Sequence, residues 1–145
     1  MAVSLSEEGH PQYVKMEKMG DVTGQSIRDF AGRHIEKGAV IKSDNYRSYH
    51  KAFREGEYTH EGERFEVKEN PEHLKWLHRV VGNMKAVIEG TYHGLGAKHL
   101  PAYLNEYSFR FNRRHFSGQL FNRLLNTCMT SPTITYRELV EPAPT

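Results

Sequence analysis

The chain has 145 residues and a formal charge of +2, which is enough length for one domain with a hydrophobic core but little for two. It is 37% hydrophobic and 26% charged, and it has neither an apolar run long enough for a membrane nor a secretory signal at its start, so the cytoplasm is the expected location. The small net charge hides an asymmetry, because residues 1–72 carry 11 Lys and Arg against 14 Asp and Glu, whereas residues 73–125 carry 8 against 2.

The first half of the chain predicts short strands followed by short helices. Residues 2–19 read as two strands around a turn that contains Gly and Pro. Apolar residues at helical spacing predict a helix that begins near residue 23 and stops at Gly38. Residues 39–41 predict a further strand, followed by a short aromatic helix. Beyond it, only a weak strand at 65–67 is indicated.

The second half predicts helices. A helix over 73–89 carries one apolar stripe, formed by Leu74, Leu77, Val81, Met84 and Ile88. Glycines break this helix, and another begins near Pro101, a residue that suits a first helical turn. The last helix spans 117–128, with Ser117 as a possible N-terminal cap. This order of elements predicts an α/β fold, in which helices pack on a mixed sheet.

Asp44 lies three residues past the strand predicted at 39–41. In an open α/β sheet, ligands bind beyond the carboxyl ends of the strands, so this carboxylate is a candidate site residue. The alternative is a helix cap, because Asp is a common N-cap residue and the sequence SDNY fits one. The local sequence alone favours the cap and leaves the ligand open.

His78 and Lys85 lie seven residues apart along one border of the apolar stripe. The simplest interpretation is an amphipathic helix with a surface His and Lys. The functional alternative is a metal site, in which His78 joins Asp44 as a ligand and Lys85 holds a phosphate. An imidazole in place of a carboxylate would favour Mn²⁺ over Mg²⁺. Asn83, on the other border, is the rival ligand, but no basic residue follows it at the same spacing.

The basic, aromatic-rich part of the chain ends in the sequence RFNRR. Arg110, Arg113 and Arg114 interleave there with aromatic residues, a combination that can hold phosphates and stack on bases. The alternative places the aromatic side chains in the core and the arginines in solvent. Cys128 is the one cysteine, which excludes an internal disulfide and a CxxC zinc site, and we expect a half-buried free thiol.

Two segments, AVIKSDNYRSY and LKWLHRVVGNMKAVIEGTYHGLGAKHLPAYLNEYSFRFNRR, resemble bacterial insertion-sequence transposases of the ISXO type. These proteins belong to the DDE superfamily and have a ribonuclease H-like fold. The similarity runs from about Ala2 to His115. It implies metal-dependent cleavage and transfer of DNA strands, with Mg²⁺ or Mn²⁺ at a two-metal site and the ends of an insertion sequence as the DNA partner.

The resemblance assigns roles to particular residues. The second acidic position of the family matches Asp44, and the third, a Glu in many members with a Lys seven residues on, falls on His78 and Lys85. The 33 residues between Asp44 and His78 suit such transposases, whereas the 38 before Asn83 fit less well. Asn83 stays the alternative, because some members have Asn there. The DNA contacts implied are Lys85, Lys98, Arg110, Arg113 and Arg114.

This sequence departs from the family at the first catalytic Asp, which lies on a strand before the part that matches here. Neither Asp21 nor Asp29 replaces it, because one falls in a turn and the other on a helix. We therefore expect an N-terminally truncated catalytic core over 1–92, a basic helical extension over 93–130 and a loose tail over 131–145.

Without that Asp, the chain alone is expected not to cut DNA. The sheet edge left without its neighbour is expected to recruit a second copy or a full-length transposase. The alternative function is a non-catalytic DNA-binding or regulatory module derived from a transposase, since the basic segment suits both. No membrane partner is expected.

Overall fold

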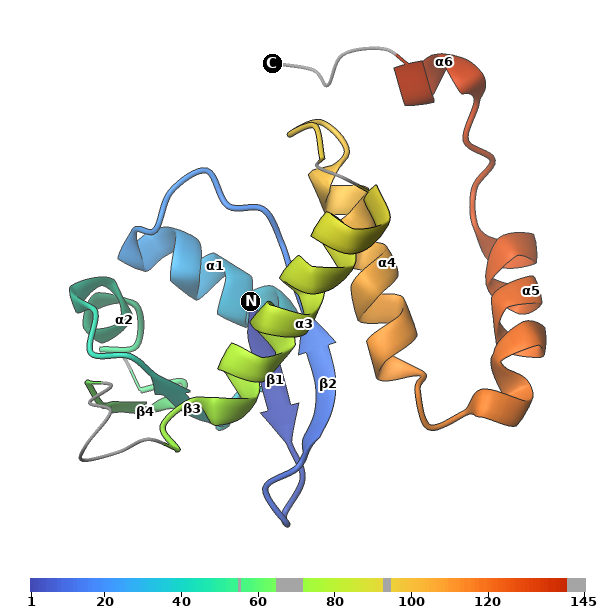
Figure 1. Ribbon diagram of the computed structural model, residues 1–145. Coiled ribbons are helices and arrows are strands. Elements are labelled where there is room, and N and C mark those ends of the chain that lie inside the picture. Colours follow the sequence, from blue (N-terminus) through green and yellow to red (C-terminus); the bar gives the residue numbers. More distant parts are fainter. Residues whose placement is uncertain (55, 65–71, 93–94, 141–145) are drawn as a thin grey trace.

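The computed structural model describes residues 1–54, 56–64, 72–92 and 95–140 (Figure 1). Small sheets and several helices make up this mixed fold, as the order of elements in the sequence predicts. The elements are β1 (Ala2–Leu5), β2 (Pro11–Lys15), α1 (Gly24–His34), β3 (Val40–Ser43), α2 (Arg47–Ala52), β4 (Thr59–Gly62), α3 (Lys75–Tyr92), α4 (Leu100–Asn112), the short 3₁₀ helix η1 (Ser117–Gln119), α5 (Leu120–Thr130) and α6 (Tyr136–Val140). The strand predicted at 65–67 lies outside the described residues.

The strands form two separate two-stranded sheets. β1 and β2 make the antiparallel hairpin that the sequence predicts, whereas β3 pairs in parallel with β4, a strand that the sequence did not indicate. One continuous mixed sheet was expected, and within the described residues this prediction is wrong. The outer edge of β2 is closed to a further strand, because side chains from the end of α4 bond its backbone there.

Asn112 and Arg114 are the residues that occupy this edge. The Asn112 side-chain amide accepts from the Val14 N–H at 2.7 Å and donates to the Val14 carbonyl at 3.0 Å. The Arg114 guanidinium donates to the carbonyls of Pro11 and Gln12. The backbone of β2 is therefore satisfied by side chains about 100 residues away in the sequence.

α1 begins and ends with clear local signals. The Thr23 side chain caps the helix by accepting from the Ser26 N–H, and an extended Ile35 ends it at His34. The predicted stop at Gly38 is four residues late. Gly38 instead forms the turn into β3, where its φ of 85° suits a residue without a side chain, and its N–H donates to the Glu57 carbonyl.

Two hydrophobic clusters form the core. The first joins α1, α2 and the start of β4 through Ile27, Ala31, Ala52, Phe53 and Tyr58. The second joins β2 and the segment after it to α3 and α4 through Val14, Met16, Val80 and Leu104. Between them, the Glu17 carboxylate accepts hydrogen bonds from Arg33 and His34 at the end of α1, at 2.9 and 3.0 Å.

α3 confirms the predicted helix but not its buried face. The five residues of the predicted stripe are all half-buried, and the residue with 2% exposure is Val80, which lies beside the stripe. The helix also continues through Gly90 to Tyr92, three residues past its predicted end. Val80 therefore anchors α3 in the second cluster, against Val14 and Leu104.

The C-terminal helices stand apart from the rest of the chain in Figure 1. Ser117 does not occupy the cap position of α5, because it opens η1. Gln119 is the N-cap residue, and its side chain makes no capping hydrogen bond. Among the described residues, no helix is both long enough and apolar enough to span a bilayer.

Candidate functional site

Asp44 lies where a parallel strand pair ends. β3 ends at Ser43 and β4 at Gly62, so the Asp44 backbone leaves the carboxyl edge of this pair. The carboxylate is exposed. α2 begins three residues later with Tyr46 as its N-cap residue and no side-chain cap, so the interpretation of Asp44 as a helix cap is wrong. The acidic side chain therefore remains available for a ligand.

The backbone around Asp44 is held by a buried serine and a histidine. The Ser43 hydroxyl donates a hydrogen bond to the Asp44 carbonyl at 2.7 Å. The hydroxyl oxygen of Ser43 also lies 2.8 Å from Nε2 of His60 on β4. One hydroxyl has one proton, so this pattern makes His60 the donor to Ser43. Burial, and to a lesser extent the neighbouring His50, lowers the pKa of His60 and favours the neutral ring.

Two further contacts complete this edge. His50 Nε2 lies 2.5 Å from Oδ1 of Asn45, the residue after Asp44, and the His50 and His60 rings meet edge to face at 5.1 Å. Burial raises the pKa of the Tyr49 hydroxyl, and the negative charge of Asp44 raises it further. Sequence reasoning missed both histidines, because only the strand register and α2 bring them to Asp44.

Asp21 and Asp29, the two other aspartates considered for a catalytic role, form hydrogen bonds with residues close to them in the sequence. Asp21 accepts hydrogen bonds from Thr23 and Ser26 before α1, and the bond from Ser26 is the main reason that the pKa of its carboxyl is lowered. Asp29 accepts from Gln25 on the same helix at 2.7 Å. Both stabilise α1, in agreement with their predicted places in a turn and on a helix.

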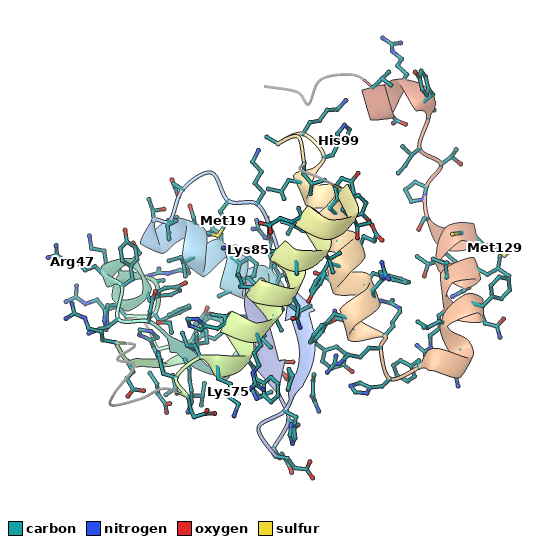
Figure 2. The ribbon with its side chains drawn as sticks, in the orientation of Figure 1. Met19, Arg47, Lys75, Lys85, His99 and Met129 are labelled. Carbon is teal, nitrogen blue, oxygen red and sulfur yellow. The ribbon has the colours of Figure 1, made fainter. Side chains whose placement is uncertain are left out.

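His78, Asn83 and Lys85 are all exposed on α3. Figure 2 shows Lys85 about midway along this helix and Lys75 at its start. Leu74, directly before the helix, has a φ of 51°, an unusual value for a residue with a branched side chain. His78 thus lies on a helix packed in the second cluster, whereas Asp44 follows a strand beside the first.

The residues around Asp44 could hold a metal ion with one or two protein ligands. Within the described ranges, no three His, Cys, Asp or Glu side chains gather closely enough to hold one. Mg²⁺ is commonly held by one or two carboxylates, with waters and substrate phosphates as the remaining ligands. The donor chemistry of Asp44 suits such a loosely held ion.

The arginines of the basic segment differ in their surroundings. Arg110 is exposed and lies 3.4 Å from Glu106, one turn earlier on α4. Arg113 stacks on the Phe109 ring at 3.7 Å, and Arg114 stacks on Phe111 while it bonds the carbonyls of β2. Arg114 is therefore part of the fold, while Arg110 presents its charge to solvent.

Another histidine, His73, was not noticed in the sequence. Its side chain is 6% exposed, its Nδ1 lies 3.2 Å from the Glu63 carboxylate, and its buried Nε2 has no hydrogen-bond partner among the residues that the structure describes. No helical or strand pattern marks such a residue, since it lies in the turn before α3. The Glu63 carboxylate therefore orients the imidazole of His73 through its Nδ1 atom.

Comparison with known protein families gives a match. A family model described as an ISXO2-like transposase domain matches residues 1–112. The comparisons with curated proteins and with solved structures each found no match. The matched region runs from β1 to the last residue of α4 and contains Asp44, all of α3 and the Asn112 contact to β2. η1, α5 and α6 lie beyond it.

Proposed function

The chain belongs to the ISXO2-like transposase domain family of the DDE superfamily, and from this premise we propose that it is the catalytic-domain part of an insertion-sequence transposase with a ribonuclease H-like core. The match over residues 1–112 carries this proposal. In the family, such a domain performs metal-dependent cleavage and transfer of DNA strands.

We assign Asp44 and His78 as the residues that hold a divalent ion, with Asn83 as the alternative to His78. A bound ion supplies charge stabilisation during phosphoryl transfer. The support for Asp44 is its exposed carboxylate at the edge of the β3–β4 pair, which caps no helix and is placed by the Ser43–His60 contact. Lys85, two turns beyond His78, would contact a phosphate of the DNA.

The polypeptide is expected to bind a metal ion and DNA without cutting the DNA. Two-metal chemistry needs a further carboxylate that bridges both ions. Asp21 and Asp29 are the only other aspartates, and both are engaged in hydrogen bonds around α1. We therefore propose that this polypeptide binds the metal ion and the DNA and does not itself carry out strand cleavage.

Asp44→Asn is expected to abolish stabilisation by Mn²⁺. At an Mn²⁺ concentration of ten times Kd, binding to the folded state adds about 1.4 kcal/mol, which raises Tm by about 3–6 °C in the unsubstituted chain. Differential scanning fluorimetry across an Mn²⁺ titration measures this shift. Asp29→Asn removes the same charge from α1 and is expected to keep the full shift.

The rival function is a DNA-binding or regulatory module without metal chemistry. The basic segment over 73–125, with 8 Lys and Arg against 2 Asp and Glu, suits this function as well. The same titration separates the two functions, because a plain DNA-binding module gives no Mn²⁺ shift in either the unsubstituted chain or Asp29→Asn. Equal shifts in Asp44→Asn and the unsubstituted chain would remove Asp44 from the site.

Arg110→Ala is expected to weaken DNA binding and its salt dependence together. Loss of one phosphate contact reduces the slope of log K against log salt by about 0.9 on duplex DNA. Fluorescence anisotropy with a labelled duplex measures this slope between about 50 and 200 mM salt, a range over which eight phosphate contacts would change the affinity about ten-thousandfold. Lys37→Ala, an exposed cation paired with Glu57 before β3, is the matched control. An unchanged slope in Arg110→Ala would mean that Arg110 lies on a solvated helix face and contacts no phosphate.

A further inference from the structure

Helix α5 is divided lengthwise into two halves of opposite character. At 100° per residue, six side chains fall within one half of the helix circumference, and all are apolar or weakly polar: Leu120, Phe121, Leu124, Leu125, Cys128 and Met129. The other half carries Asn122, Arg123, Asn126, Thr127 and Thr130. A helix of this kind is stable when its apolar half is covered.

The apolar half is uncovered in the single chain. Phe121 is 75% exposed, Met129 79% and Leu124 50%, and α5 has no buried residue. The helix packs mainly on the adjoining η1, and Figure 1 shows it displaced from α4 and the β1–β2 hairpin. Contiguous apolar surface of this kind on a soluble protein marks a contact site.

The chemistry of the helix limits what covers it. Arg123 is its only charged residue, and it lies on the polar half, where it stacks on Phe116 at 4.0 Å. A DNA-binding face needs several cations, and a helix that binds an anionic membrane carries Lys and Arg along its polar face. The remaining candidate is an uncharged apolar protein surface.

We propose that the apolar half of α5 pairs with the same half of α5 in a second copy of this chain. Two such faces bring no like charges together, because Arg123, the one charged residue of α5, lies on the polar half. Because five of its six side chains are 37–79% exposed, each face presents on the order of 600 Å² of apolar surface, the upper end of patches seen on single soluble chains. Two faces together reach roughly 1,200 Å², the lower end of specific interfaces.

This pairing differs from the sheet-edge dimer that the sequence suggested. The outer edge of β2 is occupied by Asn112 and Arg114, whereas α5 lies beyond the residues that match the transposase family. The inference therefore does not depend on metal binding or DNA binding. It makes the C-terminal helix a means of joining two copies of the domain.

Sedimentation velocity on the full chain over about 1–200 µM, the affinity range typical of small interfaces, tests the pairing. The unsubstituted chain is expected to shift from monomer to dimer as its concentration rises. Phe121→Glu places a charge at the centre of the apolar half and is expected to weaken dimerisation by more than about 30-fold, as for other central interface residues. Asn126→Glu adds the same charge on the polar half and is expected to dimerise as the unsubstituted chain does.

Far-UV circular dichroism checks that Phe121→Glu keeps its helices, because this side chain contributes nothing to either core cluster. A chain that stays monomeric over the whole concentration range would overturn the proposal. Equal dimerisation of Phe121→Glu and the unsubstituted chain would also overturn it, because the contact would then lie elsewhere on the surface. Monomeric behaviour of both variants would assign the effect to added charge rather than to the apolar half.

Discussion

Asn112→Ala is expected to lower the free energy of unfolding by about 2–4 kcal/mol, since it leaves a buried backbone donor and a buried acceptor unpaired. Both groups belong to Val14, which is 2% exposed and lies opposite Val3 in the hairpin. Alanine cannot reach either group, so neither hydrogen bond is replaced by another side-chain contact at this position. Urea unfolding followed by circular dichroism measures the change.

Two further variants show whether the hydrogen bonds or the helix are responsible. Asn105→Ala makes the same substitution at an exposed position of α4 and is expected to change stability by less than about 0.5 kcal/mol. Asn112→Asp keeps an acceptor for the Val14 N–H but faces the Val14 carbonyl with a second oxygen, so it is expected to remain destabilised. A stability of Asn112→Ala equal to that of the Asn105 control would contradict the role of this amide.

The contrast between Asn112 and the hairpin explains which parts of the fold were predictable. The β1–β2 hairpin and helices α1, α3 and α4 follow from periodicity and turn residues within a short window, and all four were predicted. The hydrogen bonds between Asn112 and Val14 join residues 98 positions apart, and no local sequence pattern predicts them. β4 was missed for a related reason, since its partner β3 lies about 19 residues earlier in the chain.

Arg114 illustrates the same limit at the candidate site. In the sequence it is one of three similar arginines beside aromatic residues, and each was predicted to contact DNA. The structure distinguishes them, because the guanidinium of Arg114 is used by the β2 carbonyls and that of Arg110 is exposed. A basic cluster in a sequence therefore indicates a charged surface, while the geometry of each side chain decides which charge can meet a phosphate.

The position of Asp44 just past a strand was predictable, because a strand end is a local feature, although β3 ends at Ser43, two residues past the predicted end. Its surroundings were not, since Ser43, His50 and His60 converge only through the β3–β4 register and the packing of α2. The roles of His78 and Asn83 stay predictions, since helix spacing puts both on exposed parts of α3. The sequence thus located one proposed ligand and left the choice of its partner open.

The two proposed ligands depend on different hydrophobic clusters. Asp44 follows β3, whose Ile41 packs against the first cluster, while His78 lies on α3, which is held in the second by Val80. A metal ion shared by these residues would therefore join the two halves of the domain. Substitution in either cluster would change the separation of the ligands without touching them.

Leu104→Ala is expected to destabilise the domain by about 2–5 kcal/mol, because Leu104 is 8% exposed at the centre of the second cluster. The lost side chain leaves a cavity between β2, α3 and α4 that these elements fill only in part. Leu124→Ala removes the same atoms from the exposed half of α5, so it is expected to change stability by less than about 0.5 kcal/mol in dilute, monomeric protein.

Urea unfolding of both variants at equal low concentration gives the comparison, and similar losses would mean that α5 is packed in solution rather than exposed. The Mn²⁺ shift in Tm adds a second measurement for Leu104→Ala. Because this substitution loosens the cluster that holds α3 but leaves the cluster beside Asp44 intact, the shift is expected to shrink if His78 contributes a ligand. A full shift in a destabilised Leu104→Ala domain would mean that the ion is held from the Asp44 side alone.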